Sequence, residues 1–292
     1  MTHALTDAEI ARYRRNGFLC PIPVLDPAEV AVSRAALEGA ESRLDGTLPR
    51  PIHEYLRSGA GIAAETPLEV ARDPRVLDRV ESLLGPDLLI WSCEYFIKEP
   101  RTDKIVSWHQ DLTYWGMDGT DHEVTAWVAL SPATPASGCM RFVPGSHTQA
   151  IVPHEDKFAE DNLLSRGQEI AVEVDEAESV PAALRPGEMS LHHGRLFHAS
   201  GPNGTDDRRI GLVIRYIRPD TPTVRAGSDY AMLARGADRT RNRINLMPPP
   251  GDFTPARLAL WEEVAAAQAS VLAEGLETED DLYKSTPEVS HA

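Results

Sequence analysis

Short stretches rich in β-branched and aromatic residues dominate the middle of this chain, and they constrain its fold more than any other feature. Pro, Gly, Asn and Asp separate these stretches, a pattern typical of short strands joined by turns. The predicted strands cover residues 88–97, 105–109, 124–130, 139–143, 170–174, 188–192 and 209–217. Because no helical pattern intervenes between them, they predict an antiparallel β-sandwich or barrel.

Helices are predicted on both sides of this β-rich region. Capping residues, prolines at first turns and stripes of apolar residues at helical spacing mark them. Their predicted starts are the capping box at residues 6–9 and the dipeptides at 26–27, 66–67 and 254–255, and a second Asp-Pro at 73–74 interrupts the third helix. Gly17 and Gly275 are expected to end the first and last of these helices.

We expect a single domain over residues 1–292, mainly β with flanking helices. It divides into a helical part at 1–87, a β core at 88–217 and a C-terminal helix at 251–277. Residues 218–250 contain a triple proline and several arginines, so they are predicted to form a long, lid-like loop over the mouth of the barrel.

Composition restricts the classes of function. The 292 residues are 42% hydrophobic and 25% charged, which is enough to bury a sizeable core. A formal net charge of −16 disfavours binding to nucleic acid or to anionic lipid, and no segment has the length of a membrane span or the pattern of a signal peptide. Three widely separated cysteines predict neither disulfides nor a thiolate metal site. We therefore expect a cytoplasmic protein, monomeric or homo-oligomeric, that acts on a small molecule.

His109 and Asp111 form an H-x-D pair at the end of the second predicted strand. Residues two apart on a strand point to the same side, so both side chains are expected to reach one metal ion. The third ligand must come from elsewhere in the fold. The strongest candidates are His192, His193 and His198. His198 is favoured because Ser200 and, across a tight turn, Arg209 follow it at fitting distances, and His193 remains an alternative.

Two imidazoles and one carboxylate on one face of an iron ion leave the opposite positions free for a co-substrate and dioxygen. The guanidinium of Arg209 would pair with a dicarboxylate that chelates that iron. The residues thus predict a non-haem Fe(II) oxygenase. One rival is a metal-dependent hydrolase or isomerase on a cupin-like barrel, which has no evident need for Arg209. The other is a non-catalytic barrel that binds a small molecule, against which an intact ligand set argues.

Five segments of the chain resemble the phytanoyl-CoA dioxygenase family, which includes ectoine hydroxylases. They are Trp-His-Gln-Asp-Leu at 108–112, Ala-Trp-Val-Ala-Leu at 126–130, Ser-Gly-Cys-Met-Arg-Phe-Val-Pro-Gly-Ser-His at 137–147, Arg-Pro-Gly-Glu-Met at 185–189 and Leu-Phe-His-Ala-Ser at 196–200. The resemblance implies a double-stranded β-helix, or jelly-roll, core of the cupin-like kind. It also implies bound Fe(II) and the conversion of 2-oxoglutarate and dioxygen to succinate and carbon dioxide.

The resemblance also implies roles for individual residues. His109, Asp111 and His198 would be the iron ligands, while Arg209 and Ser200 would hold the far carboxylate of 2-oxoglutarate. Trp127 matches a family tryptophan that lines the same pocket. Halogenating relatives replace the carboxylate ligand with a small residue, so the aspartate present here favours hydroxylation or a related oxidation.

Five further residues are expected to line the substrate cavity. They are Glu94, Phe96, Tyr114, Trp115 and Arg215. An aromatic face with a carboxylate suits a cationic amine, and Trp115 sits where ectoine hydroxylases place a tryptophan that faces the substrate. Simple packing at the barrel mouth is the alternative role for the acidic and aromatic members. Arg215 could equally be a second pocket cation or part of a salt bridge at the rim.

Overall fold

The computed structural model describes residues 3–113, 115–117, 119–157, 161–164, 167–223 and 229–272. The α-helices are α1 (Asp7–Asn16), α2 (Pro27–Leu44), α3 (Ile52–Arg57), α4 (Ala60–Ala63), α5 (Thr66–Ala71), α6 (Pro74–Leu84) and α7 (Pro255–Leu272). The strands are β1 (Phe18–Pro23), β2 (Leu88–Lys98), β3 (Val106–His109), β4 (Glu123–Ala129), β5 (Met140–Phe142), β6 (His154–Asp156), β7 (Gln168–Ile170), β8 (Val180–Pro181), β9 (Glu188–His192), β10 (His198–Ser200), β11 (Arg209–Ile217), β12 (Tyr230–Arg235) and β13 (Ile244–Asn245).

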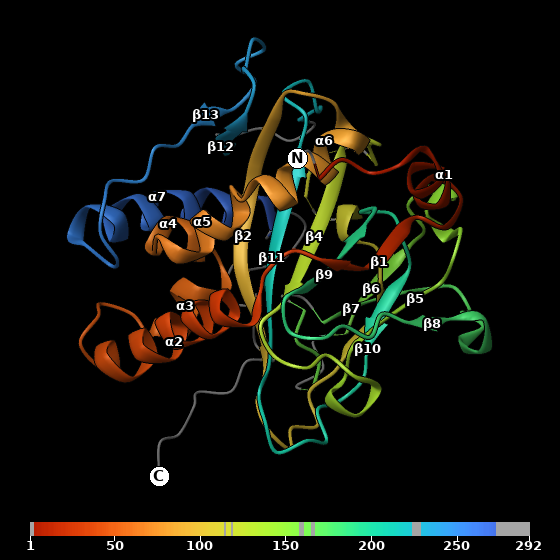
Figure 1. Ribbon diagram of the computed structural model, residues 1–292, viewed down its shortest axis with the longest axis horizontal. Helices are drawn as coiled ribbons and strands as arrows, with labels where there is room; N and C mark the ends of the chain where they lie inside the picture. The colour runs from red at the N-terminus through yellow and green to blue at the C-terminus, as the bar shows by residue number, and fades with distance from the viewer. Residues whose placement is uncertain are drawn as a thin grey trace.

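Two sheets form the core of the fold. Within the described residues the larger sheet has the order β1-β9-β4-β11-β2-β12-β13, the smaller has the order β3-β10-β5-β8, and β6 pairs with β7. Every pairing is antiparallel except that of β12 with β13. Figure 1 shows α2, α3, α4, α5 and α7 on one side of the larger sheet and the smaller sheet on the other. The predicted fold, mainly β with flanking helices and a jelly-roll core, is confirmed.

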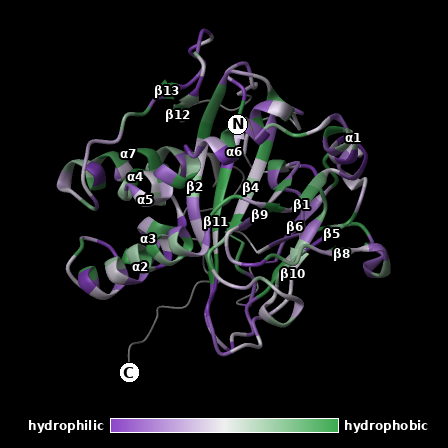
Figure 2. Cartoon of the chain, viewed as in Figure 1, coloured by the Kyte–Doolittle hydropathy of each residue, from purple (hydrophilic) through white to green (hydrophobic). Residues whose placement is uncertain are grey.

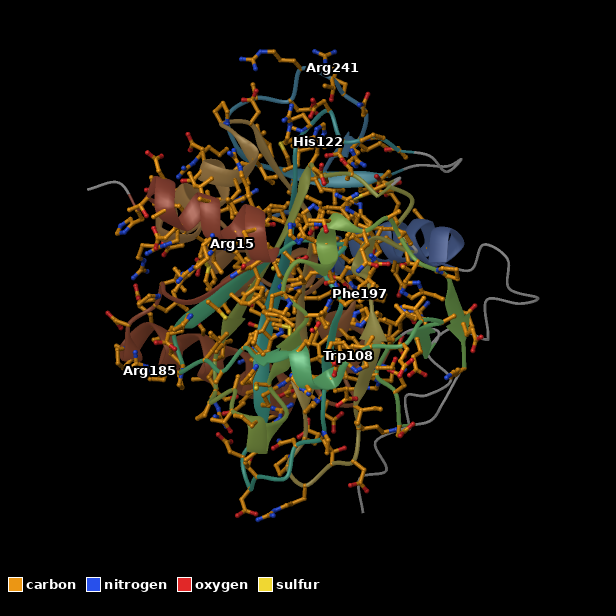
Figure 3. The ribbon with its side chains drawn as sticks, turned by 90° about the vertical axis from the view of Figure 1, so that its right-hand side faces the viewer. Arg15, Trp108, His122, Arg185, Phe197 and Arg241 are labelled. Atoms are coloured by element: carbon orange, nitrogen blue, oxygen red, sulfur yellow. The ribbon has the colours of Figure 1, made fainter. Side chains whose placement is uncertain are left out.

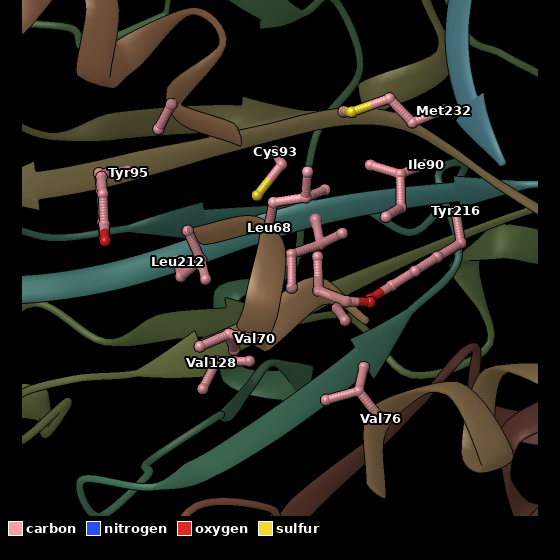
Figure 4. Close-up of a cluster of buried hydrophobic side chains, with 14 of the residues drawn as sticks. Leu68, Val70, Val76, Ile90, Cys93, Tyr95, Val128, Leu212, Tyr216 and Met232 are labelled. Carbon is pink, nitrogen blue, oxygen red and sulfur yellow. The ribbon is translucent and has the colours of Figure 1, made fainter. Parts of the chain in front are cut away.

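Every second residue of the central strands points toward the face of the larger sheet that the helices cover. On β11, Ile210, Leu212, Ile214 and Tyr216 join the apolar cluster that includes residues of α5 and α6 (Figure 4). The hydroxyl of Tyr216 donates a hydrogen bond of 2.6 Å to the carbonyl of Ala71. Figure 2 shows hydrophobic residues running along these strands. The remaining residues of β11, starting with Arg209, therefore face the space between the two sheets.

The residues predicted to begin or end the helices of the N-terminal part do so in the structure. Thr6 accepts a hydrogen bond from the backbone of Glu9, whose carboxylate accepts one from the backbone of Thr6. Gly17 has a φ of 82°, the left-handed conformation that ends α1. Asp26 caps α2, and the break before Pro74 separates α5 from α6. Local chemistry thus determines these helix ends.

Two predicted boundaries are wrong because strands lie outside the expected β core. Residues 18–23, expected within the helical part, form β1 and pair with β9 at the edge of the larger sheet. Residues 230–235, expected within a lid-like loop, form β12 and pair with β2. Each is a short strand next to turns or prolines, and its pairing partner is distant in sequence. The predicted strand at 170–174 is also displaced, since β7 spans Gln168–Ile170.

Two further findings concern the outer parts of the chain. The described C-terminal helix α7 ends at Leu272, so its predicted end at Gly275 lies outside the described residues. Among the helices in the described part of the chain, none combines the length and apolar character needed to cross a bilayer.

Candidate metal centre

His109 and His198 lie directly opposite each other on the paired strands β3 and β10. Their ring centroids are 4.0 Å apart. Asp111 lies just beyond β3, in a 3-10 turn, so the strand alternation predicted for the H-x-D pair does not account for its position. Even so, one Asp111 oxygen, Oδ1, is 3.4 Å from His109 Nε2 and 3.9 Å from His198 Nε2. Donor atoms at this spacing can share one ion, since ligands about 2.1 Å from a metal at right angles lie about 3 Å apart.

Backbone carbonyls fix the orientation of both imidazoles. Nδ1 of His109 lies 2.9 Å from the carbonyl of Ser107, and Nδ1 of His198 lies 2.9 Å from the carbonyl of Leu196. If each Nδ1 donates its proton to that carbonyl, each Nε2 keeps a free lone pair. In that tautomer, the two imidazoles direct their Nε2 lone pairs to the same point.

Asp111 is charged in this surrounding. Burial alone would raise its pKa, yet His198, His109, His192 and Arg215 around it hold the pKa well below its usual range. Burial and the neighbouring His109 likewise lower the pKa of His198 well below its usual range. An anionic Asp111 beside a neutral His198 is the protonation state that a divalent metal requires of these two ligands.

Gln110, between the two ligands, fixes the loop that carries Asp111. Its side-chain nitrogen donates to the carbonyl of Arg195 at 2.9 Å, and its side-chain oxygen accepts from the backbone of Val152 at 2.8 Å. Nε2 of His154 accepts a hydrogen bond from the backbone N–H of Gln110. Figure 3 views the molecule from this side, with Trp108 and Phe197 marking the chain next to His109 and His198. These contacts hold the three candidate ligands together without a metal.

Two buried basic side chains lie on the same inward face of the larger sheet, opposite each other on β2 and β11. They are Lys98 and Arg209, and each is 1% exposed. Nζ of Lys98 donates to Oγ of Ser200 at 2.7 Å, and burial followed by the charge of Arg209 lowers the pKa of Lys98 to about 6. Arg209 donates to the carbonyl of Gly138 at 2.8 Å, while its Nε and Nη2 have no hydrogen-bond partner among the described residues. Unpaired buried donors of this kind call for an anionic ligand.

Aromatic rings enclose the guanidinium of Arg209. Its central carbon is 5.2 Å from the ring centroid of Trp127 and 5.7 Å from that of Phe96. Phe96 thus lies at the cationic end of the space between the sheets. Trp127 packs against Gly211, where a Cβ atom would lie 1.9 Å from the indole. The missing side chain at Gly211 is what allows the tryptophan to lie beside the arginine.

Gly211→Ala is therefore expected to displace Trp127. Overpacking of this kind costs about 1–3 kcal/mol in the free energy of unfolding. Gly39→Ala on α2 is the control, because a Cβ there meets no atom within 4 Å and the substitution is expected to stabilise the helix by up to about 1 kcal/mol. Chemical denaturation of both variants measures the difference. Equal stability of Gly211→Ala and the wild type would contradict this account of Trp127.

The structure separates the other candidate residues into two groups. Arg215 contacts both Glu94 and Trp115 and lies near Asp111, whereas Tyr114 lies outside the described residues. His193, the alternative third ligand, is engaged elsewhere. Its Nε2 lies 3.1 Å from a carboxylate oxygen of Asp121, and its Nδ1 accepts from the backbone of Arg195 at 3.0 Å.

Sequence reasoning missed two residues of this centre, Lys98 and Glu123, and preferred His198 to the neighbouring His192. Lys98 could have been found by extending the predicted strand by one residue, because it shares the inward face with Glu94 and Phe96. His192 lies with Nε2 3.8 Å from Oδ2 of Asp111, and its Nδ1 has no partner among the described residues. Glu123 is fully buried, and burial followed by Asp111 raises its pKa to about 8. No local signal in the sequence marks Glu123, and none shows that His192 lies beside Asp111.

Similarity to known proteins agrees with this geometry. Residues 13–211, more than half of the chain, match the family model described as Phytanoyl-CoA dioxygenase (PhyH). The chain belongs to the phytanoyl-CoA dioxygenase family. One member, a probable phytanoyl-CoA dioxygenase of Caenorhabditis elegans, is 29% identical over 158 residues, which are 52% of this chain and 51% of that protein. The chain thus spans about half the length of the first relatives it matches.

Solved structures extend the similarity to the whole fold. The apo form of the non-heme monooxygenase ThoJ matches with a TM-score of 0.81 and 34% identity, over 91% of this chain and 97% of that one. The epimerase SnoN, in complex with Fe3+, alpha ketoglutarate and nogalamycin RO, matches with a TM-score of 0.60 and 25% identity, over 84% of this chain and 96% of that one. The jelly-roll core of this phytanoyl-CoA dioxygenase family member is thus shared with non-heme oxygenases.

Proposed function

We propose that the protein is an Fe(II)- and 2-oxoglutarate-dependent dioxygenase that hydroxylates, or otherwise oxidises, a small organic metabolite. One observation carries the proposal. A His-Asp-His set with converging donor atoms lies in the same space between the sheets as two buried basic side chains, Lys98 and Arg209, which have no carboxylate partner among the described residues. Family membership supports it. The same proposal places the protein in the cytoplasm, without a nucleic acid or membrane partner.

His109, Asp111 and His198 would hold the iron, and the donor chemistry of this set fits Fe(II). The ion, when bound, supplies the activation of dioxygen that is coupled to oxidative decarboxylation of 2-oxoglutarate to succinate and carbon dioxide. The chain's own contribution is to orient both imidazoles through the carbonyls of Ser107 and Leu196, so that each Nε2 faces the ion. An aspartate among the ligands favours hydroxylation over halogenation.

Arg209, Lys98 and Ser200 would bind the far carboxylate of 2-oxoglutarate. The free Nε and Nη2 of Arg209 offer a fork of two donors, the geometry that matches a carboxylate. Trp127 and Phe96 flank the fork and exclude water from it, which strengthens the charge interaction. These residues therefore orient the co-substrate relative to the ligand set.

Anaerobic titration of the iron-loaded protein with 2-oxoglutarate tests the proposal. We expect a visible charge-transfer absorption band and, after air is admitted, succinate release that candidate metabolites stimulate. Absence of the band would revive the non-catalytic barrel. Turnover that depends on neither dioxygen nor 2-oxoglutarate would favour the hydrolase or isomerase instead.

The lowered pKa of Lys98 predicts that the protein takes up a proton when 2-oxoglutarate binds. Its pKa of about 6 means that it is largely neutral at pH 8 before the co-substrate binds. An incoming carboxylate raises the pKa, so binding of 2-oxoglutarate at pH 8 should take up close to one proton, and the uptake should fall as the buffer pH approaches 6. Calorimetry of the iron-loaded protein under anaerobic conditions, in buffers of different ionisation enthalpy, measures this. Unchanged proton uptake in Lys98→Met would contradict the assignment.

A further inference from the structure

Glu94 and Arg215 form an ion pair beside the candidate metal centre. Nη1 of Arg215 donates to the carboxylate of Glu94 and, at 2.9 Å, to Oγ of Ser92. The two charged side chains are 14% and 16% exposed. Nε of Arg215 is buried and has no hydrogen-bond partner among the described residues. The pair is thus largely shielded from solvent, and Nε of Arg215 remains available to donate a hydrogen bond.

The position of this pair puts it on the substrate side of the centre. Arg215 lies six residues after Arg209 on β11 and shares its inward face, and its charge is close enough to act on Asp111. The guanidinium carbon is 4.5 Å from the ring centroid of Trp115, which in turn lies 5.1 Å from that of Trp91. The pair therefore lies between the ligand set and an aromatic wall.

Charge balance restricts what can bind there. Arg209 and Lys98 lie at the other end of the space, and Asp111 belongs to the ligand set. The charges of Glu94 and Arg215 cancel each other. A substrate with a single charge would leave one member of the pair buried without a counter-charge, which is costly. A substrate with both charges replaces the internal partners one for one.

We propose that Glu94 and Arg215 recognise a zwitterion of the amino-acid type, with Glu94 receiving the ammonium group and Arg215 the carboxylate. This inference rests on the proposed oxygenase function and names its substrate class. The wall of Trp91 and Trp115, continued by Leu89, Met117 and Ile217, receives the apolar part of the substrate. A coenzyme A ester, which is polyanionic and lacks the ammonium group, does not match the pair.

Four pools of compounds test this substrate class. They are the twenty common L-amino acids, their N-acetyl derivatives, their methyl esters, and the N-acetyl methyl esters, so that the pools differ mainly in charge. With iron and 2-oxoglutarate bound, the free amino acids are expected to stimulate succinate release at least tenfold more than any other pool. An equal or larger response to another pool, or no response to any pool while the charge-transfer band is intact, overturns the zwitterion assignment and leaves the oxygenase proposal standing.

Two variants test which charge of the substrate each member of the ion pair recognises. Glu94→Gln frees Arg215, so preference should move to the N-acetyl pool, whereas Arg215→Gln should move preference to the methyl esters. Arg218→Gln is the matched control, because Arg218 pairs with Asp220 at the surface and the pool preference should not change. Loss of all responses without these opposite shifts would mean that the pair is structural and would overturn the assignment.

Tryptophan fluorescence gives a readout that needs neither metal nor co-substrate. Trp115 lies against Arg215, so displacement of the ion pair by a ligand should alter its emission. The free amino acid pool, with the fluorescent tryptophan and tyrosine left out, is expected to change the fluorescence of the metal-free wild type and not that of Trp115→Phe. If the charge-transfer band is missing but this change occurs, the oxygenase proposal fails and zwitterion binding stands. If the amino acid pool causes no change, zwitterion binding fails.

Discussion

Asp111→Ala is expected to abolish succinate formation. Removal of the carboxylate leaves His109 and His198 as the remaining members of the ligand set, and iron affinity should fall by at least about 100-fold, since even outer contacts of metal ligands are worth about 10–100-fold. The anionic centre that balances the ferrous charge is lost at the same time. Iron content after dialysis and succinate release under saturating 2-oxoglutarate measure both effects.

Asp121→Ala provides the matched control for this loss. Asp121 also lies beside a buried imidazole, that of His193, but it is mostly exposed and outside the ligand set. Its removal should leave iron binding and turnover near the wild-type values. If Asp111→Ala keeps full activity, or if Asp121→Ala loses as much iron, the ligands have been assigned wrongly.

Arg209→Met should separate stability from function. Removal of the carboxylate-binding fork is expected to cost about 2–5 kcal/mol of binding free energy, which corresponds to roughly 30- to 4000-fold in affinity for 2-oxoglutarate. The same change should raise the unfolding free energy of the metal-free protein by about 1–4 kcal/mol, because an apolar side chain replaces a buried cation without a counter-charge. Titration by absorbance and chemical denaturation give the two values.

Arg208→Met is the neighbouring control. Arg208 forms ion pairs with Glu41 and Glu99 and is 19% exposed, so its loss should leave the affinity for 2-oxoglutarate unchanged and stability equal or lower. Equal loss of co-substrate affinity in both variants would show that the effect of Arg209→Met is indirect. A less stable Arg209→Met would contradict the view that the buried cation is uncompensated.

Local patterns in the sequence predict much of this fold. The helix ends at Thr6 and Asp26 follow from capping chemistry, which depends on a few neighbouring residues. The alternation of β11 likewise follows from its period of two. By contrast, β1 and β12 are defined by pairing with β9 and β2, and such distant partners leave little trace in a short segment.

The same distinction explains what could be predicted of the site. The H-x-D pair and a later histidine followed by an arginine indicate a metal set, because few other uses require that combination. Lys98 acquires its meaning from lying opposite Arg209 on the next strand, a contact between residues over a hundred positions apart. The rejection of His193 similarly needs Asp121, which the sequence alone does not place beside it.

The inward face of β11 carries both Arg209 and Arg215, and this ties accurate folding to activity. If the strand paired one residue out of register, both guanidinium groups would turn toward α5 and α6, into the apolar layer around Leu212. Such a molecule would lose its two anion-binding groups together and would bury two charges among hydrocarbon. A molecule with this mispaired sheet would therefore be both unstable and inactive. Selection for activity thus also acts against the wrong strand register.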